Sequence, residues 1–107
     1  MGFATIPQIS LDSLHQKMDS NTISLIDVRE PHEYSSKHIP KSKNLPLTEI
    51  GISDRIQSES DSVAVICPSG FRSTTAASLL KRAGTKDIVL PIDGINGWEA
   101  KGFPLEA

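Results

Sequence analysis

Three short, largely apolar runs most constrain how this chain can fold. They cover residues 23–28, 63–66 and 87–90, and each is too short for an ordinary helix but long enough for a buried strand. Weaker strand candidates lie near Ile6 and Lys43. Strands that are apolar almost throughout are typical of parallel sheets, because both faces of such a sheet are covered. We therefore expect a central, mostly parallel sheet of about five strands.

Helical patterns lie between these strand candidates. Ser10 can cap a helix whose residues 11, 14 and 18 are apolar, and residues 76–83 carry apolar side chains at helical spacing before Gly84 ends the pattern. Further helices are expected over residues 31–37, 48–56 and 95–101. Strands that alternate with helices predict an α/β fold with helices on both faces of the sheet.

Length and charge narrow the class of protein. The chain has 107 residues and a formal net charge of -2, which fits a single domain over residues 1–107. Acidic and basic residues are interspersed, so neither DNA nor RNA is an expected partner. No apolar run is long enough to span a bilayer and no signal-peptide pattern is present, so we expect a cytoplasmic protein that does not bind membranes. One cysteine and three dispersed histidines predict neither a disulfide nor a metal site.

The single cysteine, Cys67, lies where parallel α/β sheets bind their ligands. It directly follows the strand expected at residues 63–66 and precedes a helix expected to begin near Ser73. A helix N-terminus stabilises an anion such as a thiolate, although an inert buried thiol would fit the same position. A positive φ at Gly70 would turn successive N–H groups toward the sulfur, and Arg72 adds a positive charge. Pro68 has no N–H, so the expected donors are Ser69, Gly70, Phe71, Arg72 and Ser73.

Several motifs accompany this cysteine segment, which we define as residues 67–73. The segment reads Cys-Pro-Ser-Gly-Phe-Arg-Ser, residues 26–30 read Ile-Asp-Val-Arg-Glu, and residues 93–98 read Asp-Gly-Ile-Asn-Gly-Trp. In this order and spacing they resemble the rhodanese family of single-domain sulfurtransferases, over nearly the whole chain. The sequence departs from the family's pattern at Lys37, at residues 42–43 and at residues 91–93, where the family usually has glycines or other residues.

The resemblance implies a double-displacement reaction. The Cys67 thiolate would attack the outer sulfur of a donor such as thiosulfate, hold that sulfur as a persulfide and yield it to cyanide or a thiol. The partners implied are a small sulfur donor and a thiophilic acceptor, which could be a sulfur-carrier or other acceptor protein. No metal or organic cofactor is implied.

Charged residues after the strand at residues 23–28 are expected to support this site. Asp27 and Arg29 fit a structural role better than a catalytic one: a carboxylate that binds loop amides, and a charge partner for the neighbouring loop. Glu30 and Glu33 are candidates to pair with Arg29 or Arg72. The sequence leaves open whether the Arg72 side chain faces the substrate or anchors the loop from behind.

Three further residues have simple packing interpretations. His38 is expected to be a hydrogen-bonded packing residue, because an ionised thiolate needs no base, and Trp98 is expected in the core. For Phe71, packing and a role as an exposed contact for a partner protein stay equally open.

Two other functions are compatible with a cysteine and an arginine around an anion. A phosphatase or arsenate reductase of the same fold would place five residues between them, whereas residues 68–71 are only four and suit a single sulfur atom better. A non-catalytic binding module would be expected to lose the cysteine or the glycine, and this chain keeps both. The sequence therefore favours sulfur transfer.

Overall fold

The computed structural model describes residues 6–49, 62–68, 71–82, 84, 85 and 87–107, with the Phe71 side chain excepted. Its strands form one five-stranded sheet in the order β1-β5-β4-β2-β3, and every neighbouring pair is parallel. The strands are β1 (Gln8–Ile9), β2 (Ile23–Asp27), β3 (Lys43–Asn44), β4 (Ser62–Ile66) and β5 (Ile88–Pro91). The helices are α1 (Leu11–Asp19), α2 (Pro31–Ser36), α3 (Phe71–Arg82) and α4 (Gly94–Ala100), with a 3₁₀ turn at Leu47–Glu49.

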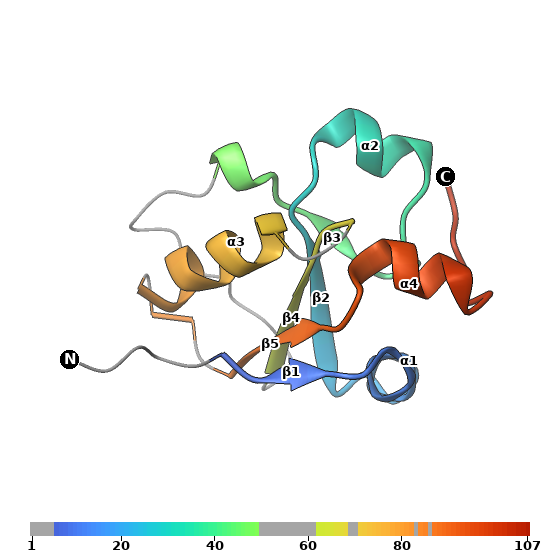
Figure 1. The fold of residues 1–107 in the computed structure, drawn as a ribbon, viewed down its shortest axis with the longest axis horizontal. Coiled ribbons are helices and arrows are strands. Elements are labelled where there is room, and N and C mark those ends of the chain that lie inside the picture. Colours follow the sequence, from blue (N-terminus) through green and yellow to red (C-terminus); the bar gives the residue numbers. More distant parts are fainter. Residues whose placement is uncertain (1–5, 50–61, 69–70, 83, 86) are drawn as a thin grey trace.

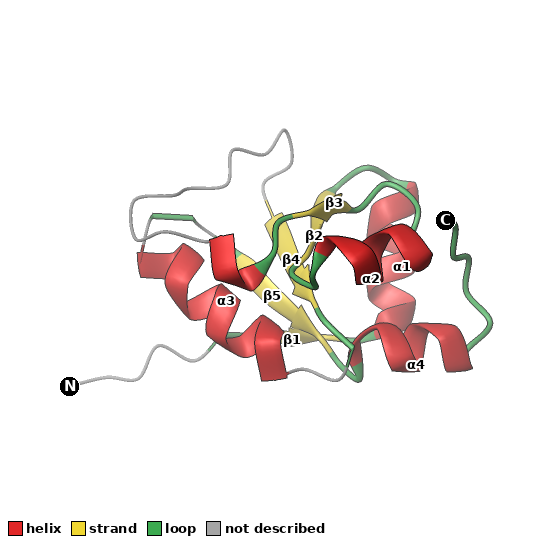
Figure 2. Ribbon diagram, turned by 90° about the horizontal axis from the view of Figure 1, so that it is seen from above, coloured by secondary structure: helices red, strands yellow, loops and turns green. Residues whose placement is uncertain are grey.

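Helices cover both faces of the sheet, as the sequence predicts (Figure 1). Helices α1 and α4 pack on one face and α3 packs on the other, while α2 lies beyond the carboxyl ends of the central strands. Figure 2 shows the same layers from above. Strand β4 is buried on both sides, because Ala64 and Ile66 face the α1–α4 layer whereas Val63 and Val65 face α3. This two-sided burial explains why its sequence is apolar without alternation.

Local signals begin two of the helices. The Ser10 side chain accepts a hydrogen bond from Ser13 N at 3.1 Å and caps α1, as its sequence predicts. Helix α2 begins with a capping box in which the Glu33 side chain accepts from the backbone N–H of Glu30 at 3.0 Å. Pro31 follows at the first helical position, where its missing N–H removes no intrahelical bond.

The element boundaries differ from the sequence prediction by one or two residues. Helix α3 begins at Phe71 rather than near Ser73, so residues 71–73 belong to its first turn. The helix expected over residues 48–56 is represented by the 3₁₀ turn, and its remaining residues lie outside the described part of the chain. No described helix has the length and apolar character needed to cross a membrane.

Candidate active site

Cys67 lies directly after β4, with its sulfur at the N-terminus of α3. The residue is 1% exposed. Its Sγ accepts a hydrogen bond from Ser73 N at 3.3 Å, and Ser73 Oγ lies 3.4 Å from the same sulfur. An N–H group of the first helical turn therefore points at the sulfur, an arrangement that favours negative charge there.

The middle of the cysteine segment cannot be compared with its prediction. Ser69, Gly70 and the side chain of Phe71 lie outside the described residues, so the expected ring of amide donors stays a prediction at those positions. At the two ends of the segment, the structure places Cys67 and Ser73 in contact.

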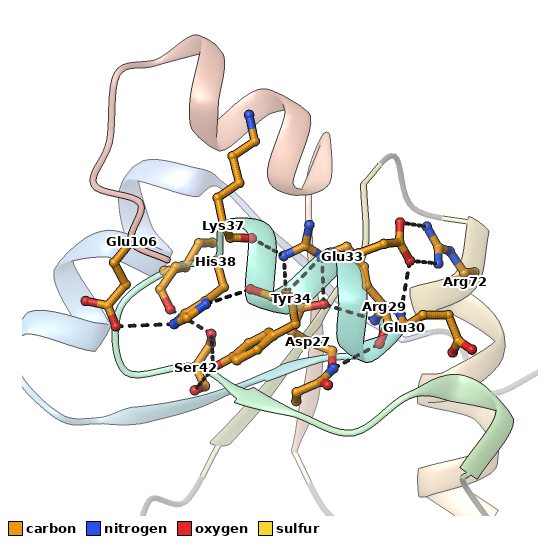
Figure 3. Close-up of polar contacts among 12 residues, drawn as sticks. Asp27, Arg29, Glu30, Glu33, Tyr34, Lys37, His38, Ser42, Arg72 and Glu106 are labelled. Atoms are coloured by element: carbon orange, nitrogen blue, oxygen red, sulfur yellow. Dashed lines mark hydrogen bonds and ion pairs between the residues drawn. The ribbon is translucent and has the colours of Figure 1, made fainter.

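Arg72 is bound by Glu33 of α2. Its Nη1 donates to Glu33 Oε1 at 2.6 Å and its Nη2 donates to Oε2 at 3.1 Å, as Figure 3 shows. The hydrogen bond from Arg72 lowers the pKa of Glu33 to about 2, and the same bond raises the pKa of Arg72 above its ordinary value. Of the pairings that the sequence left open, the structure thus selects Glu33 with Arg72 and ties the start of α3 to α2.

Asp27 and Arg29 form a second ion pair, which is buried beneath α2 (Figure 3). Arg29 Nη2 lies 2.8 Å from Asp27 Oδ2, and the two side chains are 7% and 1% exposed. Arg29 N also donates to Asp27 Oδ1 at 3.0 Å, while Nη2 donates to the carbonyl oxygen of Lys37 at 2.7 Å. These bonds connect the end of β2 with the turn before α2 and with the residue that follows α2.

The first turn of α4 contacts the cysteine segment, a contact that sequence reasoning missed. Ile95 N donates to Cys67 O at 3.0 Å and Asn96 N donates to Pro68 O at 3.1 Å. Gly94 has a φ of +57°, and a Cβ there would lie 2.2 Å from Cys67 O. A glycine is therefore required for this close approach, and its place in the Asp-Gly-Ile motif was the signal available in the sequence.

His38 and Trp98 occupy packing positions, as expected. The His38 ring stacks on Tyr34 with centroids 3.9 Å apart, and its Nδ1 lies 2.8 Å from Tyr34 O. Its Nε2 lies 3.2 Å from Glu106 Oε2, which attaches the C-terminal segment (Figure 3). Trp98 is 1% exposed, and its Nε1 donates to Pro104 O at 2.8 Å.

Among the described residues, no cluster of metal ligands adds to the site. In this part of the chain, no three His, Cys, Asp or Glu side chains gather closely enough to hold a metal ion. A cavity of about 790 Å³ lies at the opposite end of the sheet, where Ser62, Lys81 and Ile88 contribute to its wall.

Comparison with known proteins identifies the family. Residues 10–101 match the Rhodanese-like domain. The chain belongs to the rhodanese-like family. A sulfurtransferase of Allochromatium vinosum is 30% identical over 95% of this chain and 96% of its own length. YrkF of Bacillus subtilis, named as a proposed sulfur carrier protein, is 37% identical over 92% of this chain.

The solved structures agree on the fold. A rhodanese-related protein from Thermoplasma volcanium superposes with a TM-score of 0.77 at 31% identity, over 94% of this chain and 97% of that one. The human single-domain sulfurtransferase TSTD1 gives a TM-score of 0.78 at 21% identity, over 91% of this chain and 98% of that one, which shows the fold alone. The chain spans only 54% of YrkF and 54% of a Synechocystis relative.

Two departures from the rhodanese pattern have structural explanations. Lys37, in place of a usual glycine, has an extended backbone with a φ of -164°, which any residue adopts, and its side chain pairs with Glu99 of α4. Asp93, in place of the first glycine of the final turn, has a φ of +67° in the left-handed region. Aspartate tolerates this region better than most residues, so the turn is retained.

Proposed function

We propose that this rhodanese-like domain is a sulfurtransferase that carries sulfane sulfur on Cys67. The observation that carries the proposal is the position of the Cys67 sulfur at the N-terminus of α3, 3.3 Å from the Ser73 N–H. Because a thiolate is the nucleophilic form of cysteine, a site that favours negative charge on sulfur favours the attack. Relatives named as sulfurtransferases support the same activity class.

The reaction has two displacement steps. In the first, the Cys67 thiolate attacks the outer sulfur of thiosulfate, the S–S bond of the donor breaks and sulfite leaves with the bonding electron pair. In the second, a thiophile such as cyanide attacks the outer sulfur of the persulfide and the Cys67 thiolate is restored. The helix N-terminus stabilises the negative charge, which moves from Sγ to the outer sulfur and back.

The residues around Cys67 have separate roles in this proposal. Ser73 and the preceding amides of the segment bind the anionic sulfur, and Arg72 anchors the segment to α2 through Glu33. Asp27 and Arg29 hold the turn that carries α2. Cys67 is the only cysteine of these 107 residues, so the acceptor of the stored sulfur lies outside this domain.

Intact-mass spectrometry after incubation with thiosulfate tests the proposal. We expect the protein to gain the mass of one sulfur atom and to lose it on addition of cyanide, whereas Cys67→Ser gains none. If no sulfur is gained with any sulfane donor, or if the protein hydrolyses phosphoesters instead, the proposed function is wrong.

A further inference from the structure

Among the described residues, the two arginines of the site, Arg29 and Arg72, are already bound by carboxylates. Arg72 contacts the two carboxylate oxygens of Glu33 at 2.6 and 3.1 Å, and Arg29 Nε lies 3.0 Å from each oxygen of Asp27. The pKa of Glu33 is about 2, so Glu33 remains ionised at neutral pH and its pair with Arg72 persists. Together these four side chains contribute no net charge to the site.

The cysteine segment itself offers little further positive charge. Arg72 is its only cationic residue by type, since the other members of residues 67–73 are cysteine, proline, serine, glycine and phenylalanine. The partial positive charge of the α3 N-terminus, roughly half an elementary charge, then faces the sulfur. That charge can offset one negative charge of an incoming donor far better than two.

We propose that the donor for this site is an organic sulfane-sulfur compound whose terminal sulfur carries its only negative charge, taken in preference to the dianion thiosulfate. This inference rests on the proposed sulfur-transfer function and adds the substrate class. A dianion meets the Cys67 thiolate with twice the Coulomb repulsion of a monoanion at the same distance. An unpaired guanidinium would cancel that difference, but the Arg72 guanidinium is occupied by Glu33.

Methanethiosulfonate and thiosulfate form a matched pair of donors for the test. They have the same S–S bond and similar size, but a methyl group in methanethiosulfonate replaces one anionic oxygen of thiosulfate. With methanethiosulfonate the Cys67 thiolate takes the outer sulfur, the S–S bond breaks and methanesulfinate leaves with the electron pair. Because sulfinate and sulfite differ as leaving groups, each rate of persulfide formation is divided by the rate at which a neutral, water-soluble phosphine takes the outer sulfur from the same donor. This reference nucleophile carries no charge, so the ratio keeps the repulsion between the donor and the Cys67 thiolate.

We expect the normalised rate constant to be about tenfold higher for methanethiosulfonate than for thiosulfate. The thiosulfate rate should also rise with ionic strength, because salt screens the repulsion between like charges. If thiosulfate is equal or faster after normalisation, or its rate falls with added salt, an unpaired cation serves the donor and the inference is wrong.

Glu33→Gln gives a second, independent test. The substitution leaves Arg72 with an uncompensated charge, so the ratio of thiosulfate to methanethiosulfonate rates should increase several-fold. The matched control is Glu30→Gln, which removes one negative charge from the same end of α2, where Glu30 lies 3.3 Å from the Thr48 hydroxyl. Equal changes in the two variants would show that net charge alone matters and would overturn the role of the Arg72 pair.

The two proposals fail in different ways. Persulfide formation with both donors but a preference for thiosulfate overturns only the substrate class. If neither donor forms a persulfide on Cys67, the proposed function itself is wrong.

Discussion

Replacing Gly94 by alanine should disrupt the contact between α4 and the cysteine segment. The added Cβ would lie 2.2 Å from Cys67 O and 2.8 Å from Pro68 O, and both are backbone atoms that no side-chain rotation can move. A φ of +57° costs a residue with a Cβ about 1 kcal/mol. Overpacking of this kind adds about 1–3 kcal/mol. We therefore expect Gly94→Ala to lower the free energy of unfolding by about 2–4 kcal/mol.

The matched control for this variant is Gly102→Ala. Gly102 also has a positive φ, +77°, but its added Cβ would have no atom within 4 Å. Gly102→Ala should therefore lower the free energy of unfolding only by the conformational cost of about 1 kcal/mol. Urea unfolding measures both losses, and sulfur loading of the folded variants by mass spectrometry should be slower only for Gly94→Ala. Equal losses of stability, or unchanged loading in Gly94→Ala, would refute the contact argument.

Three further predictions concern the ion pairs and the sulfur contact. Glu33→Gln should lower the free energy of unfolding by about 1 kcal/mol or less, because the paired side chains are 27% and 36% exposed. The pKa of Glu33 is about 2 in the folded protein, against an ordinary value of 4.5. The difference in unfolding free energy between the variant and the unmodified protein should therefore be constant above about pH 5 and shrink as the pH falls toward 2. Asp27→Asn leaves the buried Arg29 charge without its counterion and should cost about 3–5 kcal/mol in urea unfolding, whereas a loss below about 1 kcal/mol would contradict burial of the pair. Ser73→Ala keeps the backbone donor but removes the hydroxyl 3.4 Å from the sulfur, so persulfide formation should slow by about tenfold or less, and complete loss of activity would show that the hydroxyl has a larger role.

The order of the strands and helices along the chain could be predicted because their signals are local. Apolar runs marked the three long strands, and Ser10 marked the start of α1, which the structure caps with that side chain. The place of Cys67 after β4 followed from the same reasoning, because parallel strands end where helices begin. The two short edge strands were located only approximately, since strands of two residues carry almost no pattern.

The partners of the site residues were decided by the tertiary structure. Glu33 and Arg72 are 39 residues apart in the chain. From the sequence alone, Glu30 was an equally plausible partner for Arg72, and Arg29 an equally plausible partner for Glu33. The α4 amides reach Cys67 and Pro68 only because β4 and β5 pair side by side and place the two following turns together. Local propensity fixes where an element begins, but hydrogen bonds and ion pairs between elements depend on register and packing, which arise only when the sheet has assembled.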